Sequence, residues 1–439
     1  MSIHPFLARL DRAELAPAHG VIRTVAQGHF EATGPACTVG DLCGIGSEGK
    51  PVLAEVAAVD DHRLILVPLE QERAVHPSAR VVALRGGASG QAGDAFAGRA
   101  IDALCRPFDG KGAIQALETA PLAGSVPRPL DRAAPGRKVV TGLRAIDGIL
   151  TLGEGQRIGI FAASGVGKTS LLEQLAAQID CDRCVICLVG ERGREVEALW
   201  RQLSGRADAG RFTLVAATSD ETAALRARAA NVALCLAEFW RARGEHVLFV
   251  MDSATRLAMA LREIGLAAGE PPTVRAYTPN VFAALPRIVE RCGAIRGGGA
   301  ITAIMTVLSE TDDVDDPIVE VMKSLLDGHI ILSRGLAEQG HFPAIDVSRS
   351  ISRQAARLMD GAHATAARSA VALLSVHEEA RVMIESGVYK GGANPGIDRA
   401  IAARTALMTF LQQGQSENAP FERTVALLRA AIPPEARHA

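Results

Sequence analysis

A lysine and a threonine end a glycine-containing loop in the middle of the chain. The segment AASGVGKT, residues 162–169, extends the apolar run RIGIFA and leads into SLLEQLAAQI, which is typical of a helix. A strand, a glycine loop ending in Gly-Lys-Thr and a helix together bind phosphate through backbone N–H groups and the positive end of the helix. The spacing therefore predicts a phosphate-binding loop.

Each part of this loop has an expected role in holding ATP and Mg²⁺. Gly165 and Gly167 let the backbone approach phosphate oxygens, Lys168 reaches the β- and γ-phosphates, and the Thr169 hydroxyl binds Mg²⁺. Ala162 replaces the first glycine of the motif, and alanine is an accepted variant there. The residues expected to contact the nucleotide are Ala163, Ser164, Gly165, Val166, Gly167, Lys168, Thr169 and Ser170.

Two carboxylates follow other apolar runs. HVLFVMD ends in Asp252, which can order the hydration shell of Mg²⁺. LVGERGREV places Glu191 where it can polarise a water that faces the γ-phosphate. Arg192 and Arg194 can keep Glu191 ionised or neutralise phosphate charge. Taken alone, ERGRE is also typical of a surface turn held by ion pairs.

The elements that must position these residues indicate an α/β fold. Apolar runs at 157–162, 184–190, 212–218, 246–252 and 300–308 alternate with Ala- and Leu-rich helical stretches. This pattern predicts a parallel sheet covered on both faces. Before it, short β-rich runs with frequent Gly, Asp and Pro predict a small barrel or sandwich. After it, an Ala-rich tail is expected to be helical.

Composition narrows the functional classes. The chain has 439 residues and a formal net charge of −2, so no global charge attracts nucleic acid or anionic lipid. No apolar run approaches the ~20 residues of a membrane-spanning helix. The first residues lack the basic region and apolar core of a secretion signal. We therefore expect a cytoplasmic protein.

Three of the eight cysteines have a spacing that could suggest metal. Cys181, Cys184 and Cys187 form CxxCxxC, but a tetrahedral zinc site needs a fourth ligand and none stands out. Cys187 also lies inside CVICLVG, which is typical of a buried strand. Reduced cysteines that pack as small apolar residues are therefore the favoured interpretation.

Considered together, these segments resemble the catalytic subunits of the F-type and V-type rotary ATPase superfamily. GRAIDALCRPFDG, TGLRAIDGILTLGEGQRIGIFAASGVGKT and PAIDVSRSIS carry this likeness over nearly the whole chain. Within the superfamily, the likeness is strongest to the type III secretion ATPases of flagellar export and the injectisome. GERGREV, MDSATRLAMALREIGLAAGEPP, VFAALPRIVERCG and LLDGHIILSRGLAEQGHFPAIDV carry it. DSATRLA and PTVRAYTPN depart from the usual forms of these motifs, without touching the phosphate chemistry.

The resemblance implies roles for particular residues. It makes Lys168 and Thr169 ligands of phosphate and Mg²⁺, and Asp252 a carboxylate of the metal shell. Glu191 becomes the catalytic base, with Arg192 as a partner on the phosphate side. Arg353, in SISR, matches the arginine finger that a neighbouring subunit inserts. Without the family, Arg353 is a surface arginine after a Ser-rich turn.

The resemblance also implies an organisation in four parts and a homohexamer. We expect an N-terminal docking segment at 1–20, a β-barrel at 21–90, a RecA-like nucleotide-binding domain at 91–365 and a helical domain at 366–439. If Arg353 acts in trans, a ring of identical subunits has a complete site at every interface.

The expected function is ATP hydrolysis that energises type III protein export, at the cytoplasmic face of the inner membrane. The resemblance implies partners: a stator-like regulator on the N-terminal segment, a central stalk protein, chaperone–substrate complexes and the export gate. Alternatives are a rotary ATPase catalytic subunit, a Rho-like nucleic-acid translocase and a non-hydrolysing scaffold. The translocase is disfavoured because residues 21–85 contain one aromatic residue, Phe30, and we expect no nucleic-acid partner.

Overall fold

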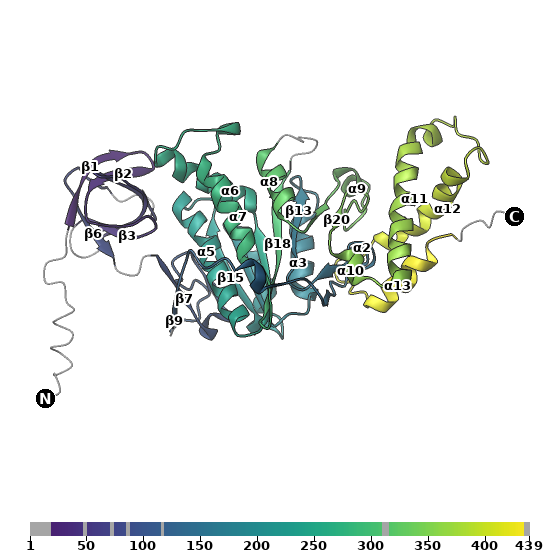
Figure 1. The fold of residues 1–439 in the computed structure, drawn as a ribbon, viewed down its shortest axis with the longest axis horizontal. Helices are drawn as coiled ribbons and strands as arrows, with labels where there is room; N and C mark the ends of the chain where they lie inside the picture. Colours follow the sequence, from purple (N-terminus) through teal and green to yellow (C-terminus); the bar gives the residue numbers. More distant parts are fainter. Residues whose placement is uncertain are drawn as a thin grey trace.

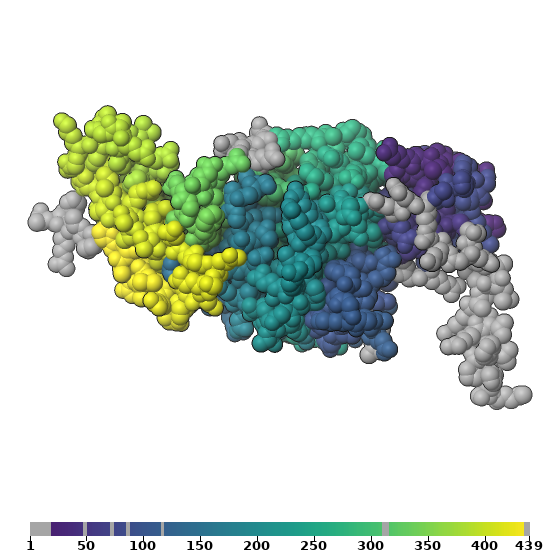
Figure 2. Space-filling model, turned by 180° about the vertical axis from the view of Figure 1, so that it is seen from behind, coloured from purple at the N-terminus to yellow at the C-terminus, as the bar shows by residue number. Residues whose placement is uncertain are grey.

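A computed structural model gives the architecture of the chain. It describes residues 19–46, 51–70, 74–84, 88–115, 118–309 and 316–433. Three parts follow one another along the long axis: an N-terminal barrel, an α/β core and a C-terminal group of helices (Figure 1). The view from behind shows the same order, with the C-terminal helices packed directly against the core (Figure 2). The expected docking segment at 1–20 falls almost wholly outside the described residues.

The barrel is closed, with strand order β1-β2-β5-β4-β3-β6. Its residues alternate between the barrel core and the outside, as in β4, where Val52, Ala54 and Val56 are buried and the residues between them are not. The strands are β1 (His19–Ala26), β2 (His29–Thr33), β3 (Leu42–Ile45), β4 (Val52–Val59), β5 (Leu64–Pro68) and β6 (Arg80–Leu84).

The core contains a ten-stranded sheet with the main order β20-β19-β13-β18-β16-β14-β15-β8. The neighbours from β19 to β8 are parallel, which confirms the predicted fold class. The sheet is not wholly parallel, because β20 and the pair β10–β17 join it antiparallel. The strands are β8 (Ala100–Ile101), β10 (Arg132–Ala133), β13 (Arg157–Ala162), β14 (Arg183–Glu191), β15 (Phe212–Thr218), β16 (His246–Asp252), β17 (Gly293–Ile295), β18 (Ala300–Leu308), β19 (Gly328–Ile331) and β20 (Ile351–Ser352).

Helices cover both faces of this sheet. One apolar cluster joins α5, α6, α7 and α8 to the first face, and a second joins α2, α3, α4 and the C-terminal helices to the other. The sheet is therefore buried on both sides, as its continuous apolar strands require. The helices are α2 (Arg144–Ile149), α3 (Lys168–Gln178), α4 (Gly193–Ser204), α5 (Ala223–Ala242), α6 (Ala254–Ala267), α7 (Pro279–Arg291), α8 (Pro317–Leu325) and α9 (Arg334–Glu338).

Smaller strand pairs link these parts, and helices form the C-terminal group. β7 (Ser89–Ala92) pairs with β9 (Glu118–Pro121), and β11 (Lys138–Val139) pairs with β12 (Leu152–Gly153). The C-terminal helices are α10 (Ala355–Leu358), α11 (Gly361–Glu385), α12 (Pro395–Leu411) and α13 (Phe421–Ala430). Among the described residues, no helix combines the length and apolar character needed to cross a membrane.

The cysteine cluster does not form a common site. Cys184 and Cys187 are both buried on β14, and they belong to the apolar cores on opposite faces of the sheet. Two thiols on opposite faces cannot bind one ion. In the described part of the chain, no group of three or more His, Cys, Asp or Glu residues is placed to hold a metal ion.

Candidate nucleotide site

The predicted phosphate loop lies at the carboxyl end of β13. Ala162 is the last residue of this strand and is buried, and α3 begins at Lys168. Gly165 and Gly167 have φ angles of 81° and 91°, which side chains with a Cβ rarely adopt. Ala162 is not among the residues with positive φ, so the strand position of the missing first glycine accepts a methyl group. The loop therefore presents its backbone and the start of α3 to the same space.

Lys168 is held by the carboxylate at the end of β16. Its ammonium group donates to Asp252 Oδ1, and the hydroxyl of Thr306 donates to the same oxygen at 2.6 Å. Asp252 and Thr306 are buried. The parallel pairing of β16 with β18 brings Thr306 beside Asp252. A cation and a hydroxyl thus fix the orientation of the carboxylate.

Glu191 completes a cluster of three charged groups. It ends β14, and its Oε1 lies 3.8 Å from Lys168 Nζ. Burial raises the pKa of Glu191 to about 7, and the negative charge of Asp252 adds to this effect while Lys168 opposes it. A carboxyl whose pKa lies near neutrality can take and release a proton under working conditions.

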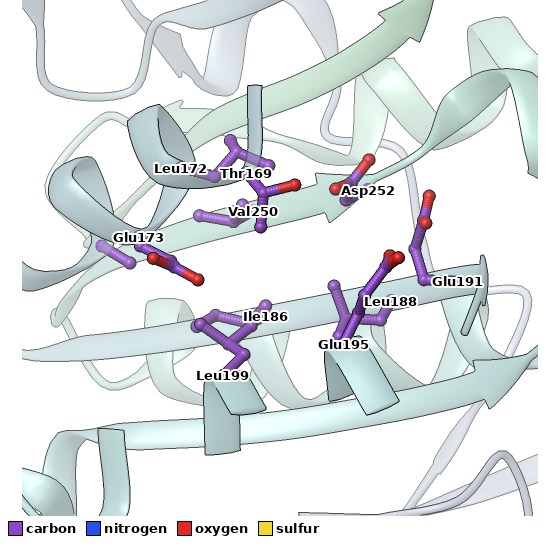
Figure 3. Close-up of a pocket in the computed structure, with 11 residues that line it drawn as sticks. Thr169, Leu172, Glu173, Ile186, Leu188, Glu191, Glu195, Leu199, Val250 and Asp252 are labelled. Carbon is purple, nitrogen blue, oxygen red and sulfur yellow. The ribbon is translucent and has the colours of Figure 1, made fainter. Parts of the chain in front are cut away.

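A small cavity of about 30 Å³ lies between α3, α4, β14 and β16. Figure 3 shows Thr169, Glu191, Glu195 and Asp252 around one space. The volume has room for a water molecule or two and is far too small for a nucleotide. A nucleotide would therefore lie over the loop, with this small space and its carboxylates beneath its phosphates.

The oxygen donors in this space fit Mg²⁺. The Thr169 hydroxyl and the Asp252 carboxylate line the same cavity from α3 and β16. Mg²⁺ prefers such hard oxygen ligands and keeps several waters of its own. The two residues predicted for the metal thus lie together, although they come from different elements.

The arginine predicted beside Glu191 is exposed, and a different arginine packs close to this carboxylate. Arg192 is the residue before α4, its side chain is 67% exposed, and it lies 4.0 Å from a Glu195 oxygen. It does not line the small cavity. Arg256, on α6, packs against Gly190, lowers the pKa of Glu191, and has a buried Nε without a hydrogen-bond partner in the described residues. Sequence reasoning missed Arg256.

Arg353 lies far from its own phosphate loop. It follows β20, whose Ser352 pairs with Gly328 at the start of β19. Its backbone N–H donates to Asp327 and its guanidinium to the backbone of Lys323. This position is level with the first residue of β13, roughly 17 Å along the strand direction from the loop. Arg353 and the loop therefore occupy opposite ends of the parallel strands.

An aromatic residue that the sequence did not single out lies beside the loop. A ring atom of Phe342 lies 3.5 Å or less from the place where a Cβ on Gly167 would stand, and Phe342 is 44% exposed. Its backbone oxygen accepts from the N–H of Gln413 in the segment after α12. Phe342 immediately precedes the PAID motif, and this position in the chain was the only feature of the sequence that pointed to it.

The fold and the cluster of Lys168, Asp252 and Glu191 define the class of protein. A parallel sheet with a glycine loop at its centre, a lysine that faces two strand-end carboxylates and a helix that begins at that lysine form a P-loop NTPase core. The family model for the ATP synthase alpha/beta family, nucleotide-binding domain, matches residues 142–352. A second model, for the T3SS EscN ATPase C-terminal domain, matches residues 359–430.

Individual relatives cover almost all of the chain. A flagellum-specific ATP synthase of Bacillus subtilis is 43% identical over 93% of this chain and 94% of its own length. The flagellum-specific ATP synthase of Salmonella typhimurium is 42% identical over 99% of this chain and 96% of its own length. A type 3 secretion system ATPase of Sinorhizobium fredii is 42% identical over 89% of this chain and 87% of its own length.

A solved structure agrees with these sequences. The structure of the assembled ATPase EscN from the enteropathogenic E. coli type III secretion system is 37% identical, with a TM-score of 0.90 over 94% of this chain and 100% of that one. The chain is therefore a P-loop ATPase that belongs to the ATP synthase alpha/beta family. Within that family it is grouped with the flagellum-specific ATP synthases and type 3 secretion system ATPases, which confirms the resemblance.

Proposed function

We propose that the chain hydrolyses ATP with Mg²⁺ and that this hydrolysis energises type III protein export. The observation that supports hydrolysis most is the convergence of Lys168, at the start of α3, with Asp252 and Glu191, at the carboxyl ends of the adjacent strands β16 and β14. Export is supported by relatives of both kinds, flagellar and secretory, at similar identity. Residues 359–430 match the secretion type of C-terminal domain, which disfavours a rotary pump.

The proposed chemistry assigns one task to each group. Lys168 binds the β- and γ-phosphates, and Thr169 and Asp252 hold Mg²⁺ directly or through water. When bound there, Mg²⁺ would neutralise charge on the transferred phosphoryl group. Glu191, when ionised, takes a proton from the attacking water while the bond between the γ-phosphorus and its bridging oxygen to the β-phosphate breaks. Thr306 positions Asp252 throughout.

The ring follows from where Arg353 lies. The loop and Arg353 are at opposite ends of the strands, so one copy cannot bring its own Arg353 to its own γ-phosphate. A second copy that packs head to tail can supply it, and such contacts close into rings when the rotation permits. We propose a homohexamer in which each site joins Glu191 of one copy to Arg353 of the next. Arg192, exposed beside the site, would face that interface.

The partners of the ring are part of the proposal. EscN has been solved in complex with its central stalk EscO, and we propose a central stalk protein for this chain. The last turn of α11 exposes Val382 and Met383, and the connection to α12 exposes Val388. These apolar side chains suit contact with chaperone–substrate complexes at the export gate. A stator-like regulator would bind the N-terminal segment, at the cytoplasmic face of the inner membrane.

The described residues of the barrel do not favour the translocase alternative. The barrel's one aromatic residue in the described strands, Phe30, is buried in the barrel core. A buried ring cannot stack on nucleic-acid bases.

The export proposal is tested in a bacterium whose own export ATPase has been deleted. Wild-type protein is expected to restore secretion of the system's substrates, and Glu191→Gln is not. Equal restoration by both proteins would contradict the role of hydrolysis in export. ATPase activity of the purified protein, measured separately, shows whether a failure lies in the chemistry or in the coupling.

Removal of the Phe342 ring is expected to weaken nucleotide binding about tenfold. We propose that the exposed ring contacts the base, and a base–aromatic stack contributes ~1–3 kcal/mol. Calorimetric titration with ADP compares Phe342→Ala with Phe342→Tyr, which keeps the ring and should bind as the wild type does. Phe108→Ala removes another half-exposed ring, away from the loop, as a control. Unchanged ADP affinity in Phe342→Ala would exclude the base contact.

The value of kcat/KM for ATP hydrolysis is expected to fall on the acid side of about pH 7. Because the pKa of Glu191 is raised to about 7, the group is protonated below that pH and cannot accept a proton. The value of kcat/KM should therefore fall roughly tenfold per pH unit on the acid side of 7 and level off above it. The profile is measured from about pH 5 to 9. A limb at the ordinary carboxyl pKa, well below 6, would contradict the assignment.

A further inference from the structure

A second cavity lies between the nucleotide-binding core and the C-terminal helices, away from the phosphate loop. Its volume is about 330 Å³, within the range of small-molecule sites. One wall comes from the segment 333–349, which joins β19 to β20, and the other comes from α11 and α12. None of the residues that line the cavity has a role in the ATP chemistry described above, although Phe342 lies on the same segment as the first wall.

The floor of this cavity is apolar and aliphatic. The lining side chains that form it are Leu336, Ile345, Leu374, Met408 and Leu411. No Phe, Tyr or Trp side chain lines the cavity within the described residues. The floor instead suits a short aliphatic body.

The lining carries one more positive than negative charge, because Arg349, Arg381 and Arg404 face two carboxylates, those of Asp346 and Glu378. Arg349 and Arg404 line the cavity, and neither makes an ion pair in the described part of the chain. The two carboxylates of the lining are already engaged. Asp346 accepts from the backbone N–H groups of Ser348 and Arg349, at 3.1 and 3.2 Å, and Glu378 pairs with Arg381 at 3.2 Å.

A buried histidine adds an unused polar group. His341 lines the same cavity and is 6% exposed, and its Nε2 has no hydrogen-bond partner among the described residues. Burial and the nearby charge of Arg404 lower the pKa of His341, so its ring is neutral at pH 7 and can donate from one nitrogen. Buried polar groups in proteins are normally paired, and a ligand would pair this one.

We propose that this cavity binds a small organic anion, with a phosphate or carboxylate group on an aliphatic body. Arg404 and Arg349 would balance the anionic group, His341 would donate a hydrogen bond to it, and the aliphatic floor would cover the body. The occupant would lie one residue from Phe342, on the segment that also leads to Arg353. The binding itself does not depend on the proposed ATPase mechanism.

Hexyl phosphate is a suitable probe, titrated calorimetrically into the full-length, nucleotide-free protein. Because a phosphate ester can also reach the phosphate loop, the titration is repeated in Lys168→Ala. We expect saturable one-to-one binding that survives Lys168→Ala and weakens at least tenfold in Arg404→Gln. Arg368→Gln is the matched control, because Arg368 is an exposed arginine of α11 that does not line this cavity. That variant should bind within twofold of the wild type.

Several results would overturn the proposal. Inorganic phosphate that binds as tightly as hexyl phosphate would reveal a nonspecific anion contact, and hexanol that binds as tightly would reveal an apolar crevice. If hexyl phosphate no longer binds Lys168→Ala but still binds Arg404→Gln, the heat of the titration comes from binding at the phosphate loop. Heptanoate, which carries a carboxylate, should bind the wild type and fail in Arg404→Gln. Thermal unfolding of each variant confirms that it is folded before it is compared.

Discussion

Replacement of Arg353 by alanine is expected to lower kcat by about 10³–10⁵-fold, the usual contribution of an arginine finger. Arg353 is exposed and makes one side-chain hydrogen bond in the described structure, to the backbone of Lys323. Its loss should therefore leave the folded subunit intact, and ADP binding to the isolated subunit should not change. Steady-state ATPase assays at a protein concentration that favours assembly measure the effect.

Arg357→Ala is the matched control for this prediction. Arg357 lies four residues further along the chain, on α10, and is also exposed. The kcat of Arg357→Ala should fall by less than a few-fold. If Arg353→Ala retains normal activity, or if Arg357→Ala loses as much, the trans assignment of Arg353 is wrong.

Replacement of Glu191 by glutamine is expected to reduce kcat by about 10²–10⁴-fold, the usual range for loss of a general base. The amide keeps the size of the side chain and cannot take a proton from water. Nucleotide binding should persist, because Lys168 and the loop are untouched, and loss of a negative charge beside Lys168 does not weaken its contact with phosphate. Single-turnover hydrolysis and ADP titration separate the two effects.

Glu197→Gln removes a second carboxylate of the same neighbourhood. Glu197 lies on α4, is more than half exposed and pairs with Arg201. Its loss should leave kcat close to that of the wild type. An active Glu191→Gln, or an equally inactive Glu197→Gln, would contradict a base role for Glu191.

Much of the site could be predicted because its chemistry depends on local sequence. The loop from Ala163 to Ser170 and the strand-end carboxylates Glu191 and Asp252 each follow an apolar strand, and parallel strands bring their carboxyl ends to one edge. The sequence therefore predicted a cluster without any knowledge of distances. It could not predict the pKa of Glu191, which depends on burial and on the charges of other elements.

The missed residues depend on tertiary packing. Thr306 reaches Asp252 only because β18 pairs with β16, although a threonine inside the apolar run AITAIMTVL was a signal that a polar partner is nearby. Arg256 reaches Glu191 across Gly190, and Phe342 reaches the loop through a connection that has no periodicity. The antiparallel strand β20 is two residues long, too short to leave a pattern.

The most direct test of the account mixes two inactive proteins. Glu191→Gln and Arg353→Ala are combined in equal amounts, and ATPase activity is measured against total protein concentration. Random assembly leaves about one quarter of the interfaces with Glu191 from one copy and Arg353 from the next. The account predicts that activity returns toward that fraction of the wild-type value and rises with concentration. A mixture that stays as inactive as its components, while wild-type activity does not vary with concentration, would contradict the shared site and the ring.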